Sequence, residues 1–324
     1  MKVLVTGATG FVGRFLVRAL VAEGHDVPAG VRPTSPTERL RGIPVRVVVA
    51  DLTQPRPLDG LMDGVEWVFH VAGDLSWWRG HRHRQWAVNV EGTRRVVAEA
   101  LRAGVRRLVH TSAVAAVGFP LDGELADEAF PFNGHRLGLQ YAVAKWEAER
   151  RVLEGVEPPL DAVIVNPATI LGDDAPRPGS LVDLAARGRL PAWVEGGTTF
   201  CHIDDVVAGH LAAARRGRTG QRYILGGHNV TFRRIIEALA QAAGRRPPAR
   251  RAPRGLVWAA AWALEGAAAL TRRPPPLTRD HARLVGRSIY YSSGRAIADL
   301  GYAVTPLATM VQLAVSRGLR APER

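Results

Sequence analysis

The chain has 324 residues, of which 47% are hydrophobic and 23% charged. This composition excludes a disordered chain and provides enough core for one large α/β domain or two unequal ones. The single cysteine, Cys201, excludes an internal disulfide framework and a cysteine-rich metal site. No metal is expected.

The net charge of +13 comes from arginine, because Lys2 and Lys145 are the two lysines among 43 basic residues. Eleven arginines fall within 245–295, against Glu265 and Asp280. No recognition helix or stacking aromatic pattern accompanies them, so no nucleic-acid partner is expected. Solvated surface is the favoured interpretation of these arginines, and a site for an anionic group or a membrane surface is the alternative.

The first residues reach Gly7 too early for the apolar core of a signal peptide. The longest apolar stretch, 256–270, is short for a membrane span and contains Glu265. A cytoplasmic protein with no membrane span is therefore expected. With Trp258 and Trp262 one turn apart, this stretch is interpreted as a core helix, and a helix lying on a membrane is the alternative.

Strand and helix patterns alternate through the first half of the chain. Strands are expected at 2–6, 26–31, 45–50, 67–72, 107–112 and 162–166, and helices at 11–23, 85–103 and 139–153. Such alternation predicts an α/β fold with a doubly wound parallel sheet of the Rossmann type. We expect this domain over 1–172, with 200–227 returning to it.

The regular alternation ends after Asn166. A loop is expected at 172–179, and helices near 180–187, 205–215, 231–243 and 255–270, with proline clusters between the later ones. These patterns predict a smaller, mainly helical C-terminal substrate cap, formed by 173–199 and 228–324.

A glycine-rich turn follows the first expected strand and opens the first expected helix. Its glycines are Gly7, Gly10 and Gly13, and the residues Thr9, Phe11 and Val12 lie between them. Glycines at this spacing allow a tight turn and close approach of a pyrophosphate to the helix N-terminus. The turn therefore predicts a dinucleotide site.

The second expected strand ends at Arg32 and has no carboxylate at 29–32. NAD-selective sites usually place a carboxylate there for the adenosine 2′-hydroxyl, whereas an arginine can pair with a 2′-phosphate. NADP is therefore the expected cofactor, with NAD left open, since Arg32 is also interpretable as one more surface arginine.

Tyr141 and Lys145 stand four residues apart on an expected helix and so share one face of it. A tyrosine titrates near pH 10 and needs a nearby cation to act in acid–base chemistry. Lys145 would supply that charge and reach the ribose of the cofactor. This pair predicts the catalytic centre, Tyr141 as the acid–base group and Lys145 as its partner.

Together these motifs resemble the extended short-chain dehydrogenase/reductase superfamily, the NAD-dependent epimerase/dehydratase family, over nearly the whole chain. The likeness is strongest to bacterial dihydroflavonol-reductase-like proteins and hopanoid-associated sugar epimerases. The resemblance implies further cofactor contacts, which are Asp51, Leu52, Val71, Ala72, Gly73, Asn89, Thr111, Pro167, Thr169 and Ile170. It also implies that Asn166 lies in the loop near the nicotinamide, where it is a candidate substrate contact.

One position departs from the family pattern. The relatives usually have Thr-Ser-Ser at the end of the fifth strand, and the second serine polarises the substrate carbonyl. Here Ala113 takes that place, and Ser112 precedes it. Successive strand side chains point to opposite faces, so Ser112 is not expected to substitute without a bulge. Weakened activity is the consequence.

Two further features have competing interpretations. Ser76, Trp77 and Trp78, with Trp86 nearby, follow the fourth strand at the ligand-binding end of the sheet, where they line a substrate pocket or simply pack. The run from Cys201 to Asp205 resembles a metal cluster. Capping of the next helix by Asp204 or Asp205 is the favoured interpretation.

The sequence thus predicts an NADP-dependent oxidoreductase that transfers a hydride between nicotinamide and a small carbonyl or secondary alcohol. A nucleotide-sugar epimerase or dehydratase is the first alternative, favoured by the arginine-rich cap. A non-catalytic NAD(P)-binding sensor or partner protein is the second, favoured by Ala113. A homodimer is a further expectation.

Overall fold

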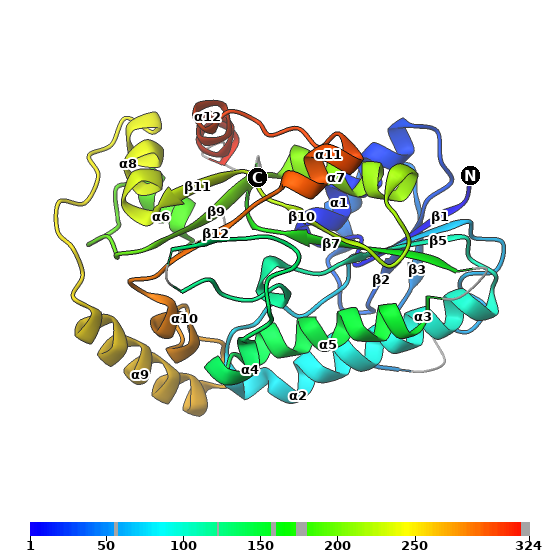
Figure 1. Cartoon of the computed structure of the whole chain (residues 1–324), viewed down its shortest axis with the longest axis horizontal. Helices are drawn as coiled ribbons and strands as arrows, with labels where there is room; N and C mark the ends of the chain where they lie inside the picture. Colours follow the sequence, from blue (N-terminus) through cyan, green and yellow to red (C-terminus); the bar gives the residue numbers. More distant parts are fainter. Residues whose placement is uncertain (55–57, 122, 157–159, 173–179, 319–324) are drawn as a thin grey trace.

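The computed structural model describes residues 1–54, 58–121, 123–156, 160–172 and 180–318. The loop expected at 172–179 falls almost entirely outside them. Within the described chain, seven strands form one parallel sheet in the order β10-β7-β5-β4-β1-β2-β3 (Figure 1). Their bounds are β1 Val3–Thr6, β2 Pro28–Val31, β3 Arg46–Val49, β4 Trp67–His70, β5 Arg107–Thr111, β7 Asp161–Pro167 and β10 Arg222–Leu225.

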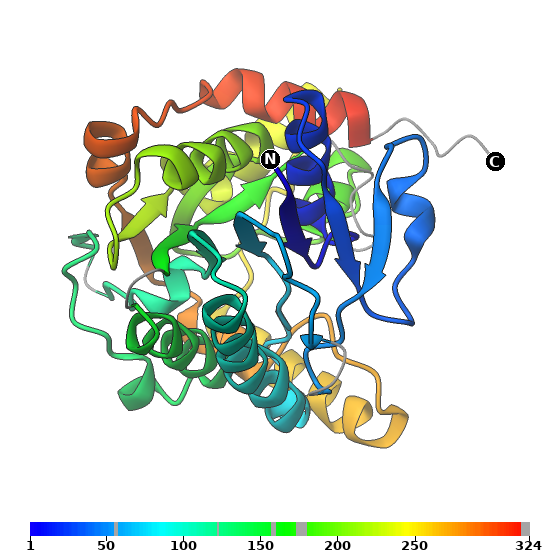
Figure 2. The same cartoon turned by 90° about the vertical axis from the view of Figure 1, so that its right-hand side faces the viewer.

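Helices cover both faces of this sheet, as the view in Figure 2 shows. One face carries α1 Phe11–Ala22, α7 Ile203–Arg216 and α11 Gly294–Leu300. The other carries α3 Gly92–Arg102 and α5 Gln140–Glu154, preceded by α2 Arg82–Gln85 and α4 Gly134–Leu137. The expected doubly wound α/β sheet is confirmed. Its strand order reverses between β1 and β4, and ligands of such sheets bind at the carboxyl ends beside that point.

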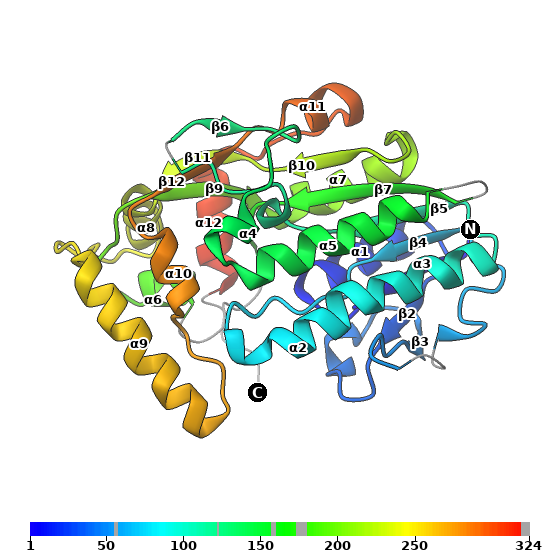
Figure 3. The same cartoon turned by 60° about the horizontal axis from the view of Figure 1, so that its bottom comes forward.

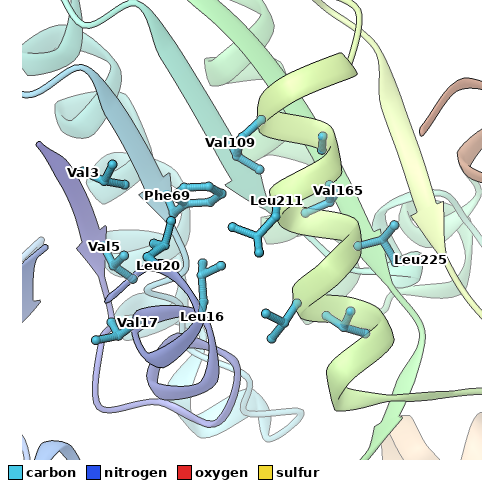
Figure 4. Packing of buried hydrophobic residues seen from close by; sticks show 14 of the residues in the cluster. Val3, Val5, Leu16, Val17, Leu20, Phe69, Val109, Val165, Leu211 and Leu225 are labelled. Atoms are coloured by element: carbon cyan, nitrogen blue, oxygen red, sulfur yellow. The ribbon is translucent and has the colours of Figure 1, made fainter. Parts of the chain in front are cut away.

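The core on the α1 and α7 face explains why these elements form. Aliphatic residues recur on one side of α1, at Leu16, Val17 and Leu20, and all three are fully buried. They meet side chains from the strands, among them Val5 and Phe69, and the facing side of α7 (Figure 4). An apolar stripe of this kind must be covered, and the sheet covers it.

A second, smaller sheet was not predicted from the sequence. Its described strands follow the order β11-β9-β12-β6, with β8 paired to β9. The bounds are β6 Leu125–Ala126, β8 Thr169–Leu171, β9 Gly197–His202, β11 His228–Thr231 and β12 Ser288–Tyr291. These strands come from distant parts of the chain and do not alternate regularly with helices, which is the pattern that revealed the main sheet.

The C-terminal part is nevertheless mainly helical, as expected. Its helices are α6 Leu181–Ala186, α8 Phe232–Ala242, α9 Arg254–Thr271, α10 Arg279–Leu284 and α12 Leu307–Gly318. Helices α6, α8 and α12 pack together on β8 and β9, whereas α9 and α10 form a separate pair at the edge of the molecule (Figure 3). No helix in the described ranges is long and apolar enough to cross a membrane.

Candidate active site at the carboxyl edge of the sheet

The turn after β1 contains two glycines that no other residue could replace without movement. Gly7 has φ +67°, and a Cβ there would lie 2.7 Å from the Cα of Ala72. A Cβ on Gly13 would lie 2.2 Å from the carbonyl oxygen of Gly7. Both separations are far below contact distance. Glycine therefore permits the turn, the segment after β4 and α1 to pack directly on one another.

The N-terminus of α1 is arranged for an anion. Gly10 is its N-cap and supplies no side-chain cap, and the first turn holds no acidic residue. The first backbone N–H groups of a helix have no partner within it, and the helix dipole adds positive potential there. Phe11 begins the helix and lies against Gly172, where an added Cβ would meet its ring at 2.4 Å. The site thus fits a pyrophosphate.

Two arginines stand at the end where the adenosine of a dinucleotide is expected. Arg32 is exposed just after β2, and its backbone N–H donates to Ser35 Oγ at 3.2 Å. Arg39, which the sequence analysis did not single out, donates from Nη1 to the carbonyl oxygen of the buried Thr9 at 3.4 Å. Asp51 is fixed by Thr53, whose Oγ1 donates to its carboxylate at 2.7 Å. Arg39 therefore contacts the glycine-rich turn directly, through the carbonyl oxygen of Thr9.

Hydrogen bonds from Thr6 and Asn89 hold the segment after β4 in place. Thr6 Oγ1 accepts the N–H of Ala72 at 3.3 Å. The side-chain amide of Asn89 accepts the N–H of Asp74 at 2.7 Å and donates to its carbonyl oxygen at 2.9 Å. Asn89 lies in a π-helical turn, Trp86–Glu91, a feature frequent at functional sites. Asn89 therefore positions 71–73 as a clamp, and Gly73 stays exposed.

Tyr141 and Lys145 lie on one face of α5, both buried. Lys145 Nζ donates to the carbonyl oxygen of Thr111 at 2.8 Å, and a Cβ on Gly73 would lie 3.9 Å from the same nitrogen. Burial lowers the pKa of Lys145 to about 8. The lysine therefore sits where the segments after β4 and β5 meet.

The tyrosine titration differs from the expectation. Burial, and secondarily the charge of Asp74, raises the pKa of Tyr141 above its ordinary value. The shift is therefore opposite in direction to the lowering expected from Lys145. Tyr141 is therefore protonated across the physiological range, the form that a proton donor needs.

A buried polar network lies one turn further along α5. Glu149 Oε1 accepts from Asn166 Nδ2 at 2.6 Å, and Arg222 Nη1 lies 3.4 Å from Oε2 of the same carboxyl. Asn166 also donates to the carbonyl oxygen of Ala113 at 3.0 Å. Because Asn166 is fully buried, the structure places it beneath the site, where it holds Ala113, rather than in the substrate lining.

Ser112 is turned toward the same network. Its hydroxyl lies beside the Glu149 carboxyl and lowers the pKa of that group, against the larger raising effect of burial. Glu149 is eight residues from Tyr141, about 12 Å along the helix. Ser112 therefore lies beside a part of α5 that is too far from Tyr141 for its hydroxyl to assist the tyrosine. Ala113, in contrast, packs in the same cluster as Tyr141.

Aromatic side chains line the space beside Tyr141. The Trp77 ring centroid lies 5.1 Å from that of Tyr141 and 5.2 Å from that of His281 on α10. The Phe119 ring centroid lies 6.5 Å from that of Trp77. Trp78 instead packs on His81, and Ser76 Oγ accepts the Trp78 N–H. Trp77 is thus the tryptophan that joins the tyrosine to the cap.

The remaining predicted contacts divide between the edge of the site and its supports. Pro167 ends β7, and Thr169 and Ile170 belong to β8, with Thr169 exposed. Thr111 is buried, and its hydroxyl is 2.9 Å from His210 Nε2, so it contributes through its carbonyl bond to Lys145. Leu52 is buried against Gly92. Neither Leu52 nor the Thr111 hydroxyl reaches the open edge.

The run from Cys201 to Asp205 has a structural role. His202, not an aspartate, caps α7 by accepting the N–H of Asp204 on Nδ1 at 3.3 Å. Asp205 instead accepts from the N–H and hydroxyl of Thr305 at 2.8 and 2.6 Å. The expected aspartate cap is therefore wrong. Among the described residues, no group of three or more His, Cys, Asp or Glu is arranged to hold a metal.

The model of the NAD dependent epimerase/dehydratase family matches residues 3–226. The chain belongs to this family. It is therefore an NAD(P)-dependent enzyme of the extended short-chain dehydrogenase/reductase type, and the non-catalytic interpretation is set aside.

Individual family members support the same conclusion. A dihydroflavonol 4-reductase-like protein of Synechocystis is 38% identical, covering 92% of this chain and 88% of its own. Sterol demethylase protein B of Methylococcus capsulatus is 35% identical, covering 94% of each chain. The crystal structure of gox2253 has a TM-score of 0.83 and 36% identity, covering 98% of this chain and 97% of its own.

Several residues of this family member's site were missed by sequence reasoning. Asp74 is buried, pairs with Arg84 at 2.8 Å and acts on Tyr141. His281 reaches the site only through tertiary packing, so no local pattern points to it. Glu149 carried a signal, because it continues the stripe of Tyr141 and Lys145 at four-residue spacing.

Proposed function

We propose that this enzyme is an NADP-dependent oxidoreductase that transfers a hydride between nicotinamide and the carbonyl or secondary alcohol of a small molecule. The observation that carries the proposal is the convergence of Tyr141 and Lys145 with Gly73 at the carboxyl edge of the sheet. A buried, protonated phenol beside a lysine supplies the proton that carbonyl reduction consumes. Bound NADPH would supply the hydride.

Each side chain has a defined task in the proposed reaction. Tyr141 donates its hydroxyl proton to the substrate oxygen, which becomes the alcohol. Lys145, held by Thr111, binds the ribose and offers positive charge to the phenolate left on Tyr141. Trp77 and Phe119 form an apolar wall that excludes water from the reacting carbon. Ala113 leaves Tyr141 as the single hydroxyl donor.

The preference for NADP rests on Arg32 and Arg39. Both are exposed near the adenosine end, and position 29–32 holds no carboxylate. A charge-assisted bond to the 2′-phosphate contributes about 1.5–3 kcal/mol, roughly ten- to a hundredfold in affinity. Calorimetric titration of NADPH and NADH into wild type and Arg32→Ala tests this. Equal affinities of wild type for both cofactors, unchanged by the substitution, would contradict it.

We further propose that the substrate is apolar, that the enzyme acts in the cytoplasm, and that residues 1–172 and 200–227 form the cofactor-binding domain. Aromatic rings border Tyr141 on the Trp77 side. The strand β10 pairs with β7, which supports the assignment of 200–227. The cap then comprises 173–199 and 228–324, and a homodimer stays a prediction.

The reaction is tested by NADPH oxidation against a panel of apolar ketones. Tyr141→Phe should nearly abolish turnover and leave NADPH affinity almost unchanged, because the ring keeps its packing against Trp77. Lys145→Ala should reduce both turnover and NADPH affinity. If Tyr141→Phe turns over any accepted ketone as fast as wild type does, the assigned role is refuted.

A nucleotide-sugar epimerase is the second candidate, and one cavity favours it. About 490 Å³ of open space lies near Leu139, bordered by His135, Arg136, Arg283 and Arg287. Such a basic lining suits the diphosphate of a sugar nucleotide. An epimerase retains its cofactor through the reaction, so mass analysis of the nucleotide that co-purifies decides. Tightly bound NAD favours the epimerase, and freely exchanging NADPH favours the reductase.

A further inference from the structure

The outer face of α9 is apolar although it is open to solvent. Its exposed positions from the second residue to the penultimate one are Gly255, Leu256, Ala259, Trp262, Ala263, Gly266, Ala267, Ala269 and Leu270. None of them is polar. The expectation of a core helix is therefore wrong for this side, since Leu256, Trp262 and Leu270 are 63%, 61% and 87% exposed.

This pattern is unusual for a helix on the surface of a globular protein. Such helices carry polar residues on the side away from the core, and helices that are apolar all round are normally buried or in lipid. The inner side of α9 is already satisfied, because Val257, Ala261 and Ala268 are buried and Glu265 pairs with Arg279 at 2.5 Å. On the outer face the guanidinium of Arg279 lies over the Trp262 ring, 4.4 Å from its centroid, and the other outer positions stay exposed.

The charges around α9 indicate what covers it. Arg250 and Arg254 stand at its start, and Arg272 and Arg273 directly follow its end. All four are exposed, and among the described residues none of them forms an ion pair. An apolar strip about 27 Å long, with cations at both ends, matches a lipid surface whose headgroups are anionic.

We infer that α9 docks the enzyme on an anionic membrane surface, with Leu256, Trp262 and Leu270 inserted among the lipids and the arginines against the headgroups. No described helix is long and apolar enough to span, so the docking is peripheral. A second copy of the chain is disfavoured as the occupant, because pairing two such faces would bring their arginines together. Figures 1 and 3 show α9 at the rim of the molecule, where a flat surface can reach it.

The docking face adjoins the site beside Tyr141. Helix α9 packs on α10, and His281 of α10 contacts Trp77, which contacts Tyr141. A membrane-dissolved substrate would thus meet the enzyme close to its cap. The docking itself does not depend on the proposed reaction.

The inference is tested by flotation of the purified full chain with two kinds of vesicle, pure phosphatidylcholine and phosphatidylcholine with roughly 30 mol% phosphatidylglycerol. The wild type should float with the anionic vesicles and bind the neutral ones at least tenfold less. Raising the salt from about 0.05 M to about 0.5 M should weaken anionic binding severalfold, because it shortens the Debye length.

Paired variants separate the apolar contribution to membrane binding from the electrostatic one. Leu256→Gln with Leu270→Gln should reduce partitioning at least tenfold, and Arg254→Gln with Arg273→Gln about twenty-fivefold. Leu153→Gln and Arg41→Gln with Arg46→Gln, exposed positions away from α9, are the matched controls and should bind as wild type does. Circular dichroism and NADPH affinity should be unchanged in every variant.

Three results would overturn the inference. The first is a wild type that does not bind anionic vesicles at low salt, and the second is a leucine double variant that binds them as tightly as wild type does. The third is a wild-type dimer in analytical ultracentrifugation that the leucine substitutions convert to monomer, which would make a second copy the occupant.

Discussion

A methyl group stands at Ala113, where the resembling families carry a serine hydroxyl. The residue has extended backbone, φ −160° and ψ 158°, and its carbonyl oxygen is fixed by Asn166. The neighbouring Ser112 is buried, and its hydroxyl lowers the pKa of Glu149. Charge that builds on the substrate oxygen therefore meets one hydroxyl donor from the chain, Tyr141.

Ala113→Ser should accelerate ketone reduction. An oxyanion donor is worth about 2.7–4 kcal/mol, a hundred- to thousandfold in rate, so the wild type should be slow on simple ketones. The measurement is NADPH oxidation by both forms against one ketone panel, with NADPH affinity determined separately. A fast wild type that gains nothing from the serine would show that another group holds the oxyanion.

Lys145 predicts a pH dependence of cofactor binding. Burial lowers its pKa to about 8, so the free enzyme loses the ammonium charge as the pH rises through that value. A bound anionic cofactor favours the charged form, so NADPH affinity should be constant below about pH 8 and fall by up to tenfold per pH unit above it. Titrations from pH 7 to 9.5 measure this.

Lys145→Met is the control for this prediction. It has no ammonium group to lose, so its NADPH affinity should be lower at pH 7 and nearly independent of pH above it. The role of Lys145 would be contradicted if wild type and variant declined in parallel.

Among the elements, the contact of α1 with the glycine turn is the tightest at the site. Gly13→Ala would place a Cβ 2.2 Å from the Gly7 carbonyl oxygen, so α1 must move away. We expect a loss of about 1–3 kcal/mol in stability and at least tenfold in NADPH affinity. Urea unfolding and calorimetry measure the two effects.

Gly266→Ala provides the comparison for a helical glycine with free space. No atom lies within 4 Å of a Cβ placed there, and alanine is the better helix former. This variant should be as stable as wild type or more stable, with NADPH affinity unchanged. If Gly13→Ala behaved like it, the turn would not be as tightly packed as the distances indicate.

Local pattern predicted the main elements well. Strands β1 to β5 and β7 and helices α1, α5, α7 and α8 lie within a few residues of the expected ranges. The expected helix at 85–103 is instead broken into α2, the π-helical turn Trp86–Glu91 and α3. Side-chain periodicity cannot resolve that change, since the clamp of Asn89 on Asp74 depends on a contact with another segment.

On the scale of the whole molecule, β12 connects the cap to the part of the site that belongs to the Rossmann domain. It pairs with β9 and with β6, and the hydroxyl of the buried Tyr291 donates to the carbonyl oxygen of Gly118 at 2.6 Å. Gly118 follows closely after Ala113. This bond thus spans 173 residues of sequence.

Tyr291→Phe should cost about 1–3 kcal/mol of unfolding free energy, because it leaves a buried carbonyl unsatisfied. Tyr290→Phe, on the same strand, is the matched control; within the described chain its hydroxyl forms no hydrogen bond. The midpoint of urea unfolding measures both. Equal midpoints for the two variants would show that the bond contributes nothing to stability.

The sequence alone determined the dinucleotide fold and the Tyr141 and Lys145 pair, because both depend on spacing within one or two neighbouring elements. Only the tertiary structure decided the second sheet, the burial of Asn166, and the placement of Asp74 and His281 near the tyrosine. It also decided that the outer side of α9 is exposed. Burial and charge at these positions come from segments far away in sequence, so no local pattern encodes them.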